Sequence, residues 1–134
     1  MRTAGLLGAA DVPGRASSVG VAREYVRSLL HAAGRGDADE VALLVSELIG
    51  NSVRHSDSGR GDQGIVRLVV ADTVRGLRVE VIDEGSPNGI PQIPAQVDPL
   101  SESGRGLWLV REMSSAWGWT ENESGLVVWF EMAR

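Results

Sequence analysis

The chain has 134 residues, of which 43% are hydrophobic and 23% charged, a composition typical of one water-soluble globular domain. Its net charge of −5 argues against direct nucleic-acid binding, because an acidic surface repels the phosphates that supply most of that affinity. The lack of cysteine excludes disulfides and thiolate metal sites, and because all 13 basic residues are arginine the chain has no Walker-A loop, which needs a lysine.

Two helices are predicted in the first half of the chain. Apolar or small residues recur at helical spacing over 18–33, with a serine to cap the start and Gly34 to end the helix. A second helix over 37–55 is predicted to open with Asp37 and Glu40 as a capping box.

The second half of the chain alternates strands with one long loop and one helix. Alternating and β-branched residues predict a hairpin of strands 65–71 and 77–83. The segment 86–103 contains prolines and no periodicity, which is typical of a lid. A helix over 106–116 and a last strand pair follow, the strands covering 117–120 and 126–132.

This order of elements predicts the fold class. Strands joined by hairpins cannot all be parallel, so we expect a mixed, mostly antiparallel sheet with helices on one face. The result is an α/β (α+β) two-layer sandwich that forms a single domain over residues 1–134.

A polar ridge on the second helix is the first candidate site. Glu47, Asn51 and His55 are spaced four apart and therefore share one face, beside the apolar arc of the same helix. A glutamate can take a proton and an asparagine carbonyl suits Mg²⁺, so the pair suits phosphoryl transfer. The alternative is a solvated helix edge, and His55 is interpreted as a helix-end residue near the C-terminal dipole.

Two loops supply further candidate residues. Asp83 ends a predicted strand immediately before Glu84-Gly85, where a carboxylate can accept a hydrogen bond from an adenine amino group; a simple Asp turn is the alternative. Gly104, Arg105 and Gly106 open a helix whose free amides and positive dipole end favour phosphate.

These motifs together resemble the GHKL family of histidine-kinase-like ATPases, over about residues 12–130. The matching boxes, in the family's order, are the N-box at 46–55, the G1-box at 83–89 and the G2-box at 104–107. The chain is most similar to small stand-alone members that look like actinobacterial anti-sigma-factor serine kinases, which share the pairs Ala22-Arg23 and Trp117-Gly118.

The resemblance implies a Bergerat-type ATP-binding fold and a role for each box. Glu47 is implied as the general base, Asn51 as the Mg²⁺ ligand and Asp83 as the adenine reader. Gly104 and Gly106 are implied as the phosphate loop. ATP and Mg²⁺ are the implied cofactors.

Three positions depart from the usual pattern. The G1-box lacks the second early glycine of many kinases, and Glu102 stands where serine kinases of the family often have a basic residue. Both departures bear on kinase activity more than on ATP binding. Gly50 inside the second helix is interpreted as room for close approach to the ligand.

The function expected from these residues is an ATP-binding regulator resembling an anti-sigma factor with serine kinase activity toward an antagonist protein. The alternatives are a non-catalytic ATP-binding module and a detached histidine-kinase catalytic domain, the latter disfavoured because no dimerisation helices or phosphoacceptor histidine are evident. The expected partners are a sigma factor and an anti-sigma-factor antagonist, with a homodimer as a further arrangement. No apolar run approaches the roughly 18 residues that span a bilayer, and no secretory signal is visible, so we expect a cytoplasmic protein without a membrane partner.

Overall fold

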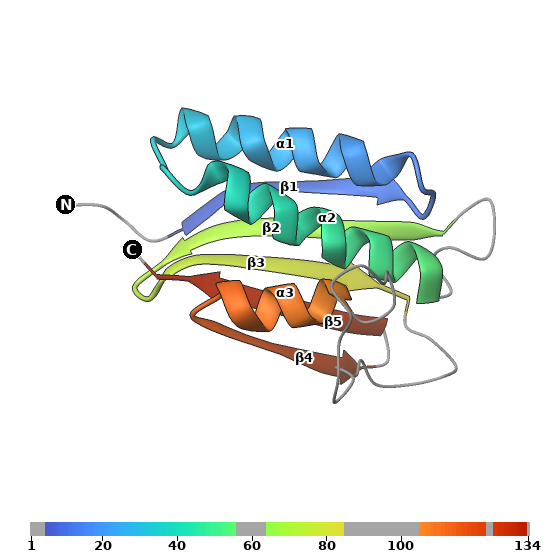
Figure 1. Cartoon of the computed structure of the whole chain (residues 1–134). Coiled ribbons are helices and arrows are strands. Elements are labelled where there is room, and N and C mark those ends of the chain that lie inside the picture. Colours follow the sequence, from blue (N-terminus) through green and yellow to red (C-terminus); the bar gives the residue numbers. More distant parts are fainter. Residues whose placement is uncertain (1–4, 56–63, 85–104, 123–124, 134) are drawn as a thin grey trace.

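The computed structural model describes residues 5–55, 64–84, 105–122 and 125–133. Three helices and five strands lie in the described residues (Figure 1). Their bounds are β1 Gly5–Pro13, α1 Ser18–Ala32, α2 Ala38–His55, β2 Ile65–Thr73, β3 Gly76–Asp83, α3 Arg105–Met113, β4 Ala116–Asn122 and β5 Gly125–Met132.

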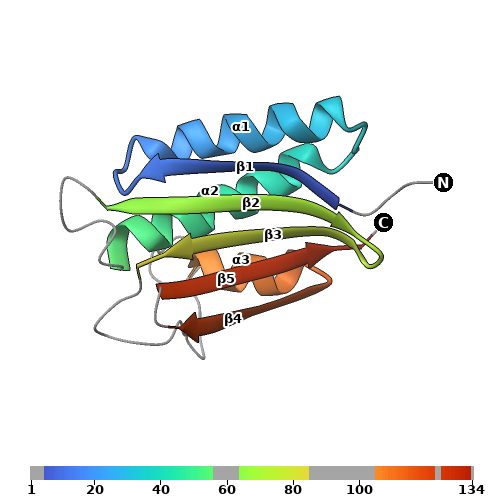
Figure 2. The ribbon, with the colours of Figure 1, turned by 180° about the vertical axis from the view of Figure 1, so that it is seen from behind.

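The strands form one sheet in the order β1-β2-β3-β5-β4. Each of its four described pairings is antiparallel. The helices cover one face of this sheet, and within the described residues the opposite face carries no helix (Figure 2). The predicted two-layer fold class is confirmed.

The core lies between the helix layer and the sheet. Val26 and Leu30 of α1 are fully buried, and α2 lies between α1 and α3 in the helix layer (Figure 1). The strands send alternate side chains to this side, because successive residues of a strand point to opposite faces. The buried hydrophobic residues larger than alanine in α2 and the three central strands are Val41, Leu44, Val45, Leu48, Ile49, Val66, Leu68, Val70, Leu77, Val79, Val81, Leu126, Val128 and Phe130.

The opposite face of the sheet carries a charged cluster around one arginine. The Arg78 guanidinium carbon lies 4.3 Å from the centre of the Trp129 ring. The same guanidinium forms ion pairs with Glu80 at 3.1 Å and with Glu131 at 3.3 Å. Through these contacts Arg78 links β3 to β5 on the face of the sheet that lies away from the core.

The first strand was not predicted from the sequence. Residues 5–13 contain two glycines and two alanines, which have weak strand propensity, and the alternation is broken by an irregularity between Leu6 and Gly8. Pairing with β2 over the whole length of β1 nevertheless makes this segment an edge strand. Tertiary context therefore overrides the local signal.

Several element boundaries also differ from the prediction. No serine caps α1 through its side chain, because Ser18 is the first residue of the helix and Ser17 makes no capping hydrogen bond. The third helix ends at Met113, and Ala116 already belongs to β4. The second helix begins at Ala38, directly after Asp37, as the predicted start requires.

The turn between α1 and α2 is held by one ion pair. Arg35 donates from Nε to Asp37 Oδ1 at 2.8 Å and from Nη2 to Oδ2 at 2.7 Å. The pair is largely buried, with 10% and 27% of the two side chains exposed. The hydrogen bonds from Arg35 lower the pKa of Asp37 below its ordinary value of 3.8, against the opposing effect of burial.

Asp37→Asn is expected to lower the free energy of unfolding by about 1 kcal/mol near neutral pH, because it removes a charged hydrogen-bond acceptor and keeps the shape. The pKa of Asp37 is lower in the folded protein than its value of 3.8 in the unfolded chain. Its carboxylate therefore stabilises the folded state fully above pH 3.8, and this stabilisation is lost as the pH falls through the folded-state pKa. In urea unfolding followed by tryptophan fluorescence, the stability gap between wild type and variant should therefore be constant above about pH 5 and should close as the pH falls below 3.8 and through the folded pKa. An equal, pH-independent loss in the exposed control Asp39→Asn would contradict this account.

Candidate functional site

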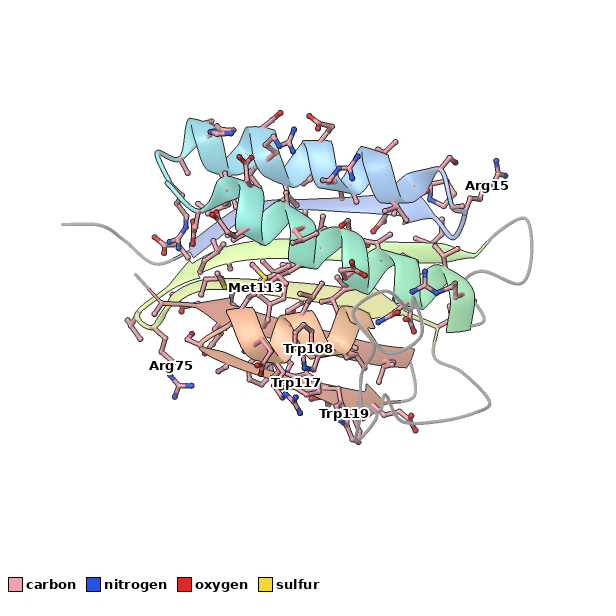
Figure 3. The ribbon with its side chains drawn as sticks, viewed as in Figure 1. Arg15, Arg75, Trp108, Met113, Trp117 and Trp119 are labelled. Carbon is pink, nitrogen blue, oxygen red and sulfur yellow. The ribbon has the colours of Figure 1, made fainter. Side chains whose placement is uncertain are left out.

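Three element ends meet at one end of the molecule. The last turns of α2, the end of β3 and the first turn of α3 lie together at the right of Figure 1. The tight β2–β3 turn, marked by Arg75 in Figure 3, lies at the opposite end. The sequence-predicted site residues in the described part of the chain all belong to this one end.

Glu47 and Asn51 both face the start of α3. They are spaced one turn apart on α2 and both are half-buried. A Cβ atom at Gly106 would lie 3.0 Å from Asn51 Nδ2, 3.2 Å from Glu47 Oε2 and 3.2 Å from Glu47 Cβ. Glu47 and Asn51 therefore line the contact between α2 and α3, and this part of the predicted ridge is not a free helix edge.

This contact explains why residue 106 is a glycine. Any side chain there would press on the two polar groups of α2, so only glycine lets the two helices approach this closely. The first turn of α3 contains no acidic residue of its own, so the positive end of the helix dipole is not neutralised from within the helix. An anionic group fits this position well.

Asp83 is an acidic residue that is buried, with 5% of its surface exposed. It is the last residue of β3 and pairs with Leu126 of β5. It lies on the helix side of the sheet, in alternation with Val79 and Val81. A buried carboxylate at a strand end is suited to recognise a hydrogen-bond donor of a ligand.

The start of β5 fits closely against the backbone of Asp83. Gly125 has φ +138°, a conformation that side chains rarely adopt, and a Cβ atom there would overlap the carbonyl oxygen of Asp83. The glycine thus fixes the position of the strand end that carries the carboxylate.

Asn51 has a second neighbour that the sequence interpretation missed. Arg54 Nη2 donates a hydrogen bond to Asn51 Oδ1 at 2.8 Å. A Cβ atom at Gly50 would lie 3.3 Å from Arg54 Nη1, so the room at Gly50 is next to this arginine. The spacing of three residues between Asn51 and Arg54 was the signal that could have identified the pair.

Some predicted residues lie outside the described part of the chain. These are Gly85, Gly104 and the whole proposed lid at 86–103. Arg105 begins α3 and His55 ends α2, but their side chains are not among those described. Their proposed roles stay predictions.

The described residues fit a magnesium nucleotide by their chemistry. Asn51 offers an amide oxygen, which is a suitable ligand for a hard cation that keeps phosphate oxygens and waters around it. Glu47 adds a carboxylate beside it, and the start of α3 offers backbone N–H groups to phosphate. Asp83 supplies a buried acceptor for the base.

Comparisons with known proteins agree with this geometry. Residues 12–132 match the family model described as the histidine kinase-like ATPase domain. A solved structure with a similar fold is the histidine kinase domain of the blue-light activated histidine kinase from Erythrobacter litoralis EL346. It is 24% identical, with a TM-score of 0.53, over 91% of this chain and 61% of that one. A comparison with curated proteins gave no match.

None of the described helices is long and apolar enough to cross a membrane. The family match covers nearly the whole chain, and the solved structure has a similar fold. The chain therefore belongs to the histidine kinase-like ATPase family and is an ATP-binding domain of that family.

Proposed function

We propose that this domain transfers the γ-phosphoryl group of ATP to a serine of an antagonist protein, and thereby regulates a sigma factor. The observation that carries the proposal is the contact of Glu47 and Asn51, one turn apart on α2, with Gly106 at the start of α3. It puts a carboxylate and an amide beside a helix N-terminus, a position suited to phosphate. We place this activity in the cytoplasm, where ATP and sigma factors are found.

Glu47 is proposed to act on the attacking hydroxyl group. The serine oxygen forms a bond to the γ-phosphorus, the bond from that phosphorus to ADP breaks, and the hydroxyl proton passes to the Glu47 carboxylate. Such transfer depends on positioning and on stabilisation of charge. Glu47 is half-buried against α3, which restricts its side chain to this region.

Asn51 and the start of α3 are proposed to hold the phosphates. A magnesium ion, when bound, neutralises charge between neighbouring phosphate oxygens. Asn51 contributes its carbonyl oxygen to that ion, and the backbone N–H groups around Gly106 bind the phosphate chain. Arg105 adds a positive charge at the same helix end.

A second candidate function comes from the solved relative. That protein is described as a histidine kinase domain, and this chain spans 61% of its length. The alternative is therefore a catalytic domain that phosphorylates a histidine on a separate helical partner. The two functions differ in the residue that receives the phosphate.

The deciding experiment is incubation with γ-labelled ATP, Mg²⁺ and a purified candidate antagonist. We expect label on the antagonist that survives acid, as phosphoserine does, and that disappears when the acceptor serine is replaced by alanine. Asn51→Ala should lose both the labelling and the Mg²⁺ dependence of ATP affinity, since its oxygen holds the metal. Calorimetry at several Mg²⁺ concentrations measures the second effect.

Each of the other outcomes would support a different function. Acid-labile label on a histidine would favour the histidine kinase function. ATP binding without any transfer, in the presence of the cognate antagonist, would leave a non-catalytic binding module.

A further inference from the structure

The oxygen of Asn51 that is suited to a metal is already hydrogen-bonded to a cation. Arg54 Nη2 lies 2.8 Å from Asn51 Oδ1. A guanidinium has N–H donors and no acceptor, so the Asn51 atom that faces it is the carbonyl oxygen. The amide nitrogen points the other way, toward Gly106. Arg54 and a metal ion would therefore bind the same atom, Asn51 Oδ1.

Two cations cannot share this oxygen without a cost. The guanidinium keeps its charge at every pH at which the protein is folded, so deprotonation does not release the site. A divalent ion on Asn51 Oδ1 would lie within a few ångström of that charge and be repelled by it. Metal binding at Asn51 thus requires Arg54 to move away.

Gly50 provides the space in which Arg54 reaches Asn51. The guanidinium folds back along α2, and its Nη1 would lie 3.3 Å from a Cβ atom at position 50. The two next-nearest side-chain atoms, both at 3.9 Å from that Cβ position, belong to the same guanidinium. A methyl group there would press first on Arg54. The glycine, unfavourable inside a helix, is accounted for by this contact.

We propose that Arg54 is a tethered cation that competes with Mg²⁺ for Asn51 Oδ1 and so sets the Mg²⁺ concentration at which the domain takes up Mg-ATP. The inference rests on the proposed function, which makes Asn51 the metal ligand. Arg54 acts through Asn51 and is a positioning residue. Because it is exposed on α2, it can leave the oxygen without disturbing the core.

The test measures ATP affinity by calorimetry over a series of free Mg²⁺ concentrations. The readout is the free Mg²⁺ concentration at which the apparent dissociation constant for ATP has fallen halfway to its Mg²⁺-saturated value, because this midpoint equals the dissociation constant of Mg²⁺ from the protein–ATP complex. Arg54→Gln should lower this midpoint by roughly threefold to tenfold, the range expected for loss of one competing hydrogen bond. Arg75→Gln, the same change at the opposite end of the molecule (Figure 3), should leave it unchanged.

Gly50→Ala separates the hydrogen bond from the charge. It keeps Arg54 and its charge but crowds the guanidinium, so a smaller decrease in the midpoint is expected. Alanine also favours the helix, so this variant should fold. In both variants the side-chain amide signals of Asn51 in NMR spectra should shift before any nucleotide is added.

An unchanged or higher midpoint in Arg54→Gln would overturn the inference, and so would ATP affinity that is independent of Mg²⁺ in the wild type. A lower midpoint in a protein that transfers no phosphate to its antagonist would support the inference and refute the kinase function. Failure of the Arg54 inference and failure of the kinase function therefore give different results.

Discussion

Replacing Glu47 with alanine is expected to slow phosphoryl transfer by about 10²–10⁴-fold, while the affinity for Mg-ATP stays close to that of the wild type. The carboxylate is proposed to take the proton of the attacking hydroxyl, and this interaction develops mainly in the transition state. Loss of an interaction made only there lowers the rate and spares ground-state binding. The measurement is single-turnover transfer from labelled ATP, combined with calorimetry.

The position of Glu47 makes two further variants informative. Glu47→Gln keeps the size of the side chain against Gly106 and removes only the base, so it should be as slow as Glu47→Ala. Glu40→Ala, an exposed glutamate nearer the start of the same helix, should transfer phosphate at the wild-type rate. A large loss of ATP affinity in both Glu47 variants would instead assign this residue to binding.

Asp83→Asn is expected to weaken ATP binding by about tenfold or more, because a charged hydrogen-bond acceptor for the adenine amino group becomes neutral. The substitution keeps the shape of a side chain that is 5% exposed, so the fold should survive. Calorimetry gives the affinity, and thermal unfolding checks the fold. Glu112→Gln, an exposed carboxylate on α3, is the matched control and should bind ATP normally.

A nucleotide with a different base tests more directly whether Asp83 recognises adenine. ITP carries an oxygen where ATP carries the amino group, so a carboxylate at residue 83 should repel it. The amide of Asp83→Asn can donate to that oxygen, and the preference for ATP over ITP should therefore shrink. An unchanged preference would remove Asp83 from base recognition, even if ATP affinity fell.

The helix layer could be predicted from the sequence because it depends on local periodicity. Residues of α2 such as Val41, Leu44, Val45 and Leu48 recur at helical spacing, and the structure buries all of them. The same periodicity placed Glu47 and Asn51 on one face. The strand pairs around Gly76 and Gly125 were predictable from alternation and turn residues.

The first strand depended on information that local sequence does not contain. Segment 5–13 has little strand propensity, and β2 supplies the hydrogen bonds that make it extended. The end of α3 shows the same limit, because the predicted helix extended to residue 116 although the chain leaves the helix after Met113 and enters β4.

By itself the sequence determined the fold class, the order of the motifs and the residue types at the site, since these follow from periodicity and side-chain chemistry. Only the tertiary structure decided which groups meet. It brought Gly106 of α3 against Glu47 and Asn51, although these residues are more than fifty positions apart in the chain. It also placed Arg54 on the oxygen of Asn51, over the gap at Gly50. Such contacts depend on how whole elements pack and on which rotamer a side chain adopts, and neither is specified by spacing along the chain.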